Sequence, residues 1–179
     1  MTAWVALLRG VNVGGVTIRN ADLVSLMQRD LGLEDVRTFL ASGNAAFTAD
    51  AAPGARGDLK RRIEAGLRER FGYDAWIVLK TRDEVEQART GFPFDASDGT
   101  RQPWVVFGSD DAVLDELATA AASLDADVDP VARGRGVLYW NPVKGTTTDT
   151  PFAKLLARAA YRTSTTNRNL RTLGRILAP

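Results

Sequence analysis

The chain has 179 residues, 45% hydrophobic and 25% charged, with a net charge of +1, which is the balance of a folded globular protein and not of a disordered one. It contains no cysteine and no histidine, which excludes Ser-His and Cys-His nucleophile pairs, thiol redox chemistry and zinc sites built on these ligands. The sequence has no run of about 18 apolar residues to cross a bilayer, and its first residues lead straight into a strand, so we expect a cytoplasmic protein without membrane contact.

The first part of the chain alternates between strand and helix patterns. Residues 4–9 form a continuous apolar run, typical of a central strand. The elements predicted after it are a helix at residues 20–31 with Asn20 as N-cap, a hairpin of strands at 36–40 and 44–48, an amphipathic helix at 59–71, and a strand at 75–80. This βαββαβ order predicts a ferredoxin-like unit with an antiparallel sheet of strand order 4-1-3-2.

A connecting segment follows this unit. Thr81 and Glu84 have the spacing of a capping box, which predicts a short helix through Thr90. Residues 91–102 are rich in glycine, proline and small polar residues, and we predict a boundary loop there.

The same order of patterns then begins again. The predicted elements are strands at residues 104–107, 128–132, 137–140 and 163–166, and helices at 110–122, from Thr150 and Pro151 to about residue 160, and at 167–177. We therefore predict an α+β chain of tandem ferredoxin-like (βαββαβ) subdomains with antiparallel sheets. Their bounds are residues 1–80 and 103–179, the latter with an extra C-terminal helix, joined by residues 81–102.

Charge is segregated along the second part of the chain. Residues 91–132 contain one basic and nine acidic residues, whereas residues 133–179 contain nine basic and one acidic residue. We expect the two stretches to pack side by side and neutralise each other. The alternative is a basic surface for an anionic partner.

Three blocks of the sequence carry a family resemblance. They are residues 6–15 (ALLRGVNVGG), 36–47 (VRTFLASGNAAF) and 165–169 (TTNRN). Together they resemble the bacterial family catalogued as domain of unknown function 1697, in order and over the full length of the chain. The resemblance implies the tandem ferredoxin-like fold, and it implies no activity.

Two of these blocks are expected to meet at one edge of the first sheet, because the loop after the first strand and the hairpin share that edge. The candidate ligand-binding residues there are Arg9, Asn12, Gly14, Gly15, Ser42, Gly43 and Asn44. Glycine allows close approach of the backbone, asparagine supplies a donor and an acceptor, and arginine suits phosphate or carboxylate. The alternative is that these residues serve only the turns.

The third block is expected at the start of the terminal helix, where free backbone amides favour an anion. Its candidate residues are Thr166, Asn167, Arg168 and Asn169, and plain N-capping is the alternative. Along that helix, Arg168, Arg171 and Arg175 recur on one face. We weigh a nucleic-acid contact surface there against an ordinary solvated face.

Three functions stay open on these observations. The first is a binding module for an anionic ligand, either a nucleotide-like small molecule or nucleic acid. The second is an enzyme with an oxygen- or amide-based site, and the third is an interaction protein or homodimer. We predict no cofactor and no metal site, because no motif for carboxylate-bound Mg²⁺ is present.

Overall fold

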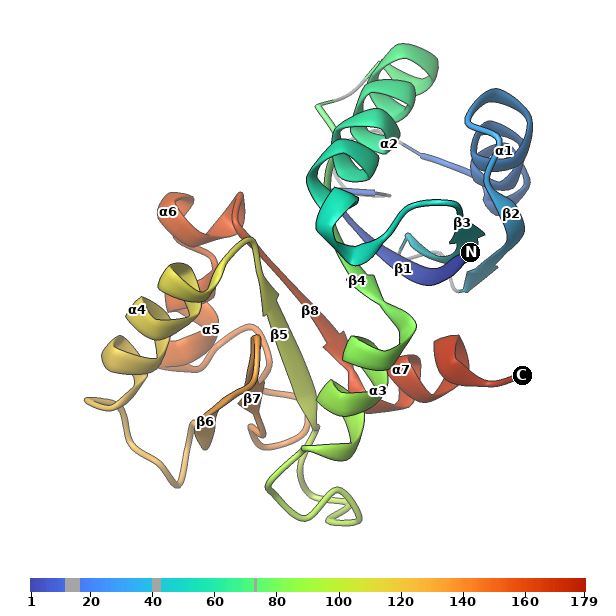
Figure 1. Cartoon of the computed structure of the whole chain (residues 1–179). Helices are drawn as coiled ribbons and strands as arrows, with labels where there is room; N and C mark the ends of the chain where they lie inside the picture. The colour runs from blue at the N-terminus through green and yellow to red at the C-terminus, as the bar shows by residue number, and fades with distance from the viewer. Residues whose placement is uncertain (12–16, 40–42, 73) are drawn as a thin grey trace. The chain divides into compact units, whose positions relative to one another are not determined.

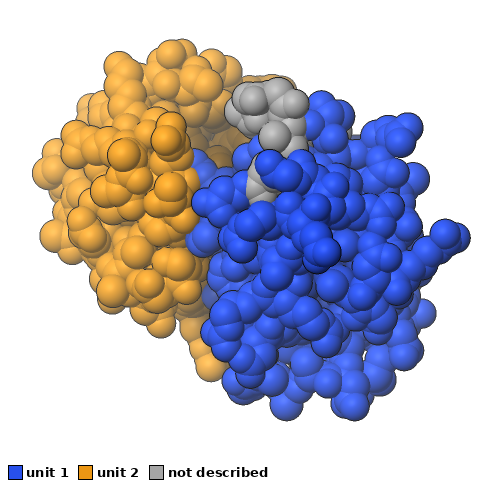
Figure 2. All heavy atoms as spheres, turned by 90° about the horizontal axis from the view of Figure 1, so that it is seen from above, with its two compact units in different colours: residues 1–85, 175–179 blue, residues 86–174 orange. Residues whose placement is uncertain are grey.

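The computed structural model describes residues 1–11, 17–39, 43–72 and 74–179. The chain divides into two compact units, residues 1–85 with 175–179 and residues 86–174 (Figure 2). Within the described ranges, no helix is both long and apolar enough to cross a membrane.

The first unit contains a four-stranded antiparallel sheet. Its strands are β1 (Thr2–Arg9), β2 (Glu34–Phe39), β3 (Asn44–Ala49) and β4 (Trp76–Thr81). They are arranged in the order β2-β3-β1-β4, so β1 and β3 are central and β2 and β4 are the edges. Read from β4 to β2, this is the predicted order 4-1-3-2.

Two helical segments cover one face of this sheet (Figure 1). They are α1 (Asn20–Ser25), continued by the π-helix η1 (Leu26–Asp30), and α2 (Arg56–Phe71), preceded by the 3₁₀ turn η2 (Pro53–Ala55). Alternation along β1 points Trp4, Ala6 and Leu8 toward these helices, where they join Ile63 and Leu67 of α2 in one buried core.

The first helix differs from its prediction at the start and in its second half. Asn20 is the first helical residue, and the N-cap position belongs to Arg19, which makes no side-chain capping bond. The Leu31 amide donates to the Leu26 carbonyl at 3.0 Å, five residues back, and this widened turn replaces the expected regular helix. Gly32, at φ 61°, follows directly and ends it.

The predicted capping box is confirmed at the start of α3 (Arg82–Thr90). The Glu84 amide donates to the Thr81 hydroxyl at 3.2 Å, and the Thr81 amide donates to the Glu84 carboxylate at 2.7 Å. Each of the two residues therefore satisfies a free backbone donor of the other.

The second unit repeats the topology of the first. Its strands are β5 (Trp104–Gly108), β6 (Val131–Gly134), β7 (Val137–Trp140) and β8 (Thr165–Asn169), in the antiparallel order β6-β7-β5-β8. Its helices are α4 (Asp111–Ala121), α5 (Pro151–Leu156) and α6 (Ala159–Arg162), and α7 (Leu170–Leu177) ends the chain. The fold is therefore α+β and tandem ferredoxin-like, as predicted.

Some predicted boundaries in this unit are wrong. The helix capped by Thr150 ends at Leu156, and α6 begins separately after residues 157–158. Residues 125–129 form a turn, with the Asp129 amide bonded to the Asp125 carbonyl at 2.8 Å, so β6 starts later than expected.

The predicted terminal helix also starts too early. Residues 165–169 are strand β8 because they pair with β5 over its whole length, and α7 begins only at Leu170. Asn169 marks the change, since its side-chain oxygen accepts the Arg171 amide at 2.9 Å.

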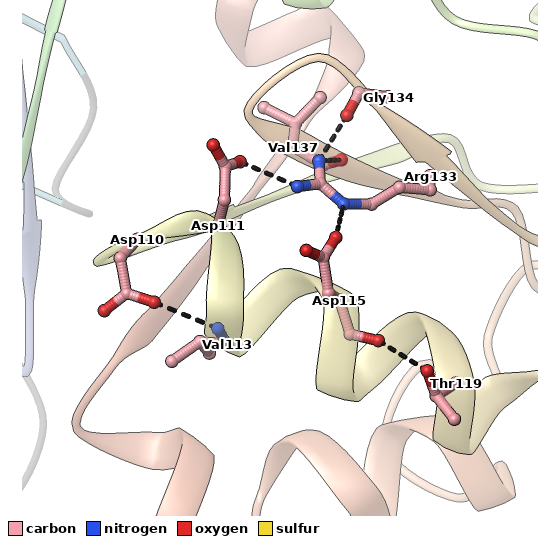
Figure 3. A network of polar contacts seen from close by, with 8 residues as sticks. All are labelled: Asp110, Asp111, Val113, Asp115, Thr119, Arg133, Gly134 and Val137. Atoms are coloured by element: carbon pink, nitrogen blue, oxygen red, sulfur yellow. Dashed lines mark hydrogen bonds and ion pairs between the residues drawn. The ribbon is translucent and has the colours of Figure 1, made fainter.

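One contact supports the expected pairing of acidic and basic stretches. Arg133 of β6 donates to Asp111 at 2.7 Å and to Asp115 at 2.8 Å, both on α4 (Figure 3). Its third nitrogen donates to the Val137 carbonyl at 3.1 Å and to the Gly134 carbonyl. The guanidinium thus ties β6 and the start of β7 to α4, and it is engaged on every side.

Candidate functional site

The structure brings together part of the predicted edge between β1 and the hairpin. Arg9 is the last residue of β1, Leu7 is paired with Asn44 in the β1–β3 register, and the Leu8 amide donates to the Gly43 carbonyl at 2.8 Å. The other predicted residues of this edge, Asn12, Gly14, Gly15 and Ser42, lie outside the described residues.

Gly43 and Asn44 have clear local functions in the hairpin. Gly43 has φ 69°, and a Cβ placed there would lie 2.8 Å from the Leu8 Cβ. Asn44 is fully buried, and its side-chain nitrogen donates to the Phe39 carbonyl at 2.9 Å. These contacts favour the alternative in which both residues serve the turn, and a ligand role stays a prediction.

The third predicted block is a strand that ends directly before α7. Thr166, Asn167, Arg168 and Asn169 all belong to β8. Arg168 is 7% exposed, and its guanidinium donates to the Thr166 hydroxyl at 2.6 Å and to the Asn167 carbonyl at 3.0 Å. The expectation of free helical amides at this block is therefore wrong.

The predicted helical face of three arginines is not formed either. Arg171 and Arg175 are exposed on α7, but Arg168 precedes the helix and is buried in the sheet. Two exposed cations one turn apart are an ordinary solvated helix surface.

A hollow that the sequence did not indicate lies on the sheet of the first unit. It has a cavity volume of ≈ 530 Å³, and we call it the sheet groove. Its lining residues include Ala3, Gln28, Asp35, Arg37, Thr48 and Arg82. Volumes of about 300–1,000 Å³ are usual for sites that bind small molecules.

The strand register explains why Ala3, Arg37 and Thr48 share one face of the sheet. Ala46 of β3 is paired with Val5 of β1 on one side and with Arg37 of β2 on the other, and Ala3 is paired with Thr48. Paired residues point to the same side of a sheet, and their neighbours along each strand point to the other side. The small side chains of Ala3 and Ala46 leave room on this face.

Two guanidinium groups border the sheet groove. Arg37 is exposed, and its guanidinium lies 6.0 Å from the centre of the Phe39 ring. Arg82, partly buried at the start of α3, donates to the Leu177 carbonyl. Neither makes an ion pair with any carboxylate of the described chain.

Seven other described arginines differ from them in this respect. The arginines with a carboxylate partner are Arg19, Arg56, Arg61, Arg68, Arg70, Arg89 and Arg133. The two arginines of the sheet groove therefore retain hydrogen-bonding capacity for an anion.

Two backbone irregularities border the same hollow. Gln28 belongs to the π-helix η1, a form that often occurs at functional sites. Asp35 has φ 49°, the only positive φ among the described non-glycine residues, and lies where the β2–β3 register shifts between Glu34 and Arg37. Bulges and left-handed residues are often found beside binding sites.

The described residues contain no group of three or more acidic side chains placed to hold a metal ion. The chemistry of the sheet groove is thus that of arginine, amide, hydroxyl and one carboxylate. Such a set can bind and orient a polar ligand through hydrogen bonds.

Comparison with known proteins identifies a family and a fold. A family model described as "Protein of unknown function (DUF1697)" matches residues 1–139. The solved structure of the conserved bacterial protein SP0830 from Streptococcus pneumoniae is similar, with 22% identity over 99% of each chain and a TM-score of 0.78. No curated protein matches the chain in sequence. The similarity to SP0830 supports the fold and carries no activity.

Proposed function

The chain belongs to the DUF1697 family of proteins of unknown function, and we propose that it is a binding module for a small anionic ligand held in the sheet groove. One observation carries this proposal. Arg37 and Arg82 border a single hollow, and neither guanidinium has a carboxylate partner within the described part of the chain.

The physical reason is the chemistry of the guanidinium group. Arginine presents planar pairs of N–H donors that match two oxygens of a phosphate or carboxylate, and such charge-assisted bonds are roughly twice as strong as neutral ones. Thr48 and Gln28 add a hydroxyl and an amide to the same hollow. The ligand we propose is therefore a phosphate-bearing small molecule.

A small molecule suits the geometry better than nucleic acid does. The sheet groove, at ≈ 530 Å³, has the volume of a small-molecule pocket. The nucleic-acid hypothesis depended on a helical face of three arginines, and Arg168 is buried in β8 instead.

The test is calorimetric titration of the purified full chain at low salt with inorganic phosphate and with adenosine 5′-monophosphate. We expect saturable binding that Arg37→Ala weakens about tenfold or more, since a hydrogen bond between charged groups is worth roughly 1.5–3 kcal/mol. Arg37 is the residue to change because it is exposed, so its removal leaves the core intact.

Arg29→Ala is the matched control. Arg29 is another exposed arginine of the first unit, on η1, and it does not line the sheet groove. The variant loses the same charge as Arg37→Ala does, but it should bind both anions as tightly as the unchanged protein. Equal losses in both variants would mean non-specific attraction, and the absence of binding to either anion would contradict the proposal.

A further inference from the structure

The carboxylate of Asp35 borders the same groove as the guanidiniums of Arg37 and Arg82. The Thr48 hydroxyl donates to Asp35 Oδ2 at 3.2 Å, which places the carboxylate on the same face of the sheet as Thr48 and Arg37. Its other oxygen, Oδ1, has no hydrogen-bond partner in the described chain. A carboxylate in this position repels a bare anion but accepts hydrogen bonds from O–H or N–H groups.

The backbone at Asp35 also departs from its neighbours. The φ of 49° lies in the left-handed region, which glycine adopts without steric strain and aspartate tolerates. This residue falls at the register shift between Glu34 and Arg37, so the strand is locally rearranged where the carboxylate meets the groove. The local fold therefore keeps an acidic side chain beside two arginines.

We infer that the ligand is a phosphate monoester that also carries hydroxyl groups, such as a sugar phosphate, with the phosphate on Arg37 and Arg82 and a hydroxyl on Asp35. This inference rests on the proposed function. Asp35 and Arg37 both line the sheet groove, so one small molecule can present a different polar group to each of them. The Asp35 carboxylate then selects against inorganic phosphate and against phosphate esters that carry no hydroxyl group to donate a hydrogen bond.

Two probes separate these contributions. Methyl phosphate is a monoester without hydroxyl donors, and ribose 5-phosphate is a monoester with several. We expect the unchanged protein to bind ribose 5-phosphate about tenfold more tightly than methyl phosphate, because hydrogen bonds to a carboxylate are charge-assisted.

Two variants of the full chain test the role of Asp35. Asp35→Asn and Asp35→Gly both tolerate a positive φ, so the bulge is retained. We expect ribose 5-phosphate to bind about fivefold more weakly to Asp35→Asn and about tenfold more weakly to Asp35→Gly. Methyl phosphate should bind equally well or more tightly, because a repelling charge has been removed. Circular dichroism checks that both variants are folded.

The outcomes separate the two proposals. Weaker binding of ribose 5-phosphate to Asp35→Asn, with methyl phosphate bound equally well or more tightly, supports the selection by hydroxyl groups. If both probes bind and depend on Arg37 but neither affinity depends on Asp35, the inference is overturned and the proposed function stands. If neither probe binds, or Arg37→Ala leaves both affinities unchanged, the proposed function itself is overturned.

Discussion

The indole N–H of Trp140 donates a hydrogen bond of 2.8 Å to the carboxylate of Asp129, which is only 2% exposed. The second carboxylate oxygen accepts the Phe152 amide at 2.9 Å, near the start of α5. This carboxylate therefore satisfies two buried donors. It also lies near a helix N-terminus, where a negative charge is favourable. It joins the end of β7 to α5.

Removing this carboxylate should destabilise the protein strongly. Asp129→Ala leaves two buried N–H groups without an acceptor, and we expect the free energy of unfolding to fall by about 3 kcal/mol. Urea denaturation, monitored by circular dichroism, measures this loss of stability. Asp127→Ala, at a nearby exposed aspartate, is the control and should change stability by less than about 0.5 kcal/mol. Similar stabilities of the two variants would show that the buried carboxylate is dispensable.

Gly43 provides a second prediction, at the point where β3 meets β1. Gly43→Ala places a methyl group 2.8 Å from the Leu8 Cβ and requires φ 69° of a non-glycine residue. Because neither atom can rotate away, we expect the free energy of unfolding to fall by about 3 kcal/mol.

Gly72→Ala is the matched comparison for that substitution. Gly72 also has a positive φ, 66°, but apart from its chain neighbours no heavy atom of the described residues lies within 4 Å of a Cβ placed there. This variant should lose only the backbone preference, about 1 kcal/mol. Thermal and urea unfolding of both variants measure the difference, and equal losses would show that the contact between β1 and β3 at Gly43 relaxes easily.

Much of the fold follows from local sequence patterns. The apolar run at β1, the four-residue spacing of Leu59, Ile63 and Leu67 in α2, and the capping box of Thr81 and Glu84 all specify elements through neighbouring residues. The boundary at β8 could not be read in this way. Residues 167–169 are compatible with a helix, and only pairing with β5 makes them a strand.

The sheet groove was missed for the same reason. Its residues come from β1, η1, β2, β3 and the start of α3, and only the register brings Ala3, Arg37 and Thr48 to one face. The second family block contains Arg37, but the glycine and asparagine of that block predict a turn and give no sign of a groove. The left-handed conformation of Asp35 cannot be predicted from the residue type, since aspartate is common in ordinary turns.

Glu84 makes stability depend on pH. Burial raises its pKa, but the bond from the Thr81 amide and the ion pair with Arg56 outweigh burial and hold the pKa below its ordinary value of 4.5. The folded state therefore binds fewer protons than the unfolded state in this range. The stabilising contribution of Glu84 is complete above about pH 4.5 and is lost as the pH falls through the lowered pKa.

Glu84→Gln isolates this contribution. Glutamine keeps an acceptor for the Thr81 amide but loses the charge that pairs with Arg56 at 2.8 Å. Because this pair is partly exposed, we expect the free energy of unfolding at pH 6 to fall by only about 0.5–1 kcal/mol. The difference between the two proteins should shrink as the pH falls through the lowered pKa of Glu84, because Glu84 then becomes protonated. Other carboxylates have a pKa lowered by hydrogen bonds from Ser97, Thr100 and the Val113 amide, and these titrate alike in both proteins. Urea unfolding of both proteins from pH 6 to pH 3 measures the difference directly. A difference that stays constant with pH would show that the ion pair with Arg56 does not set the charge state of Glu84.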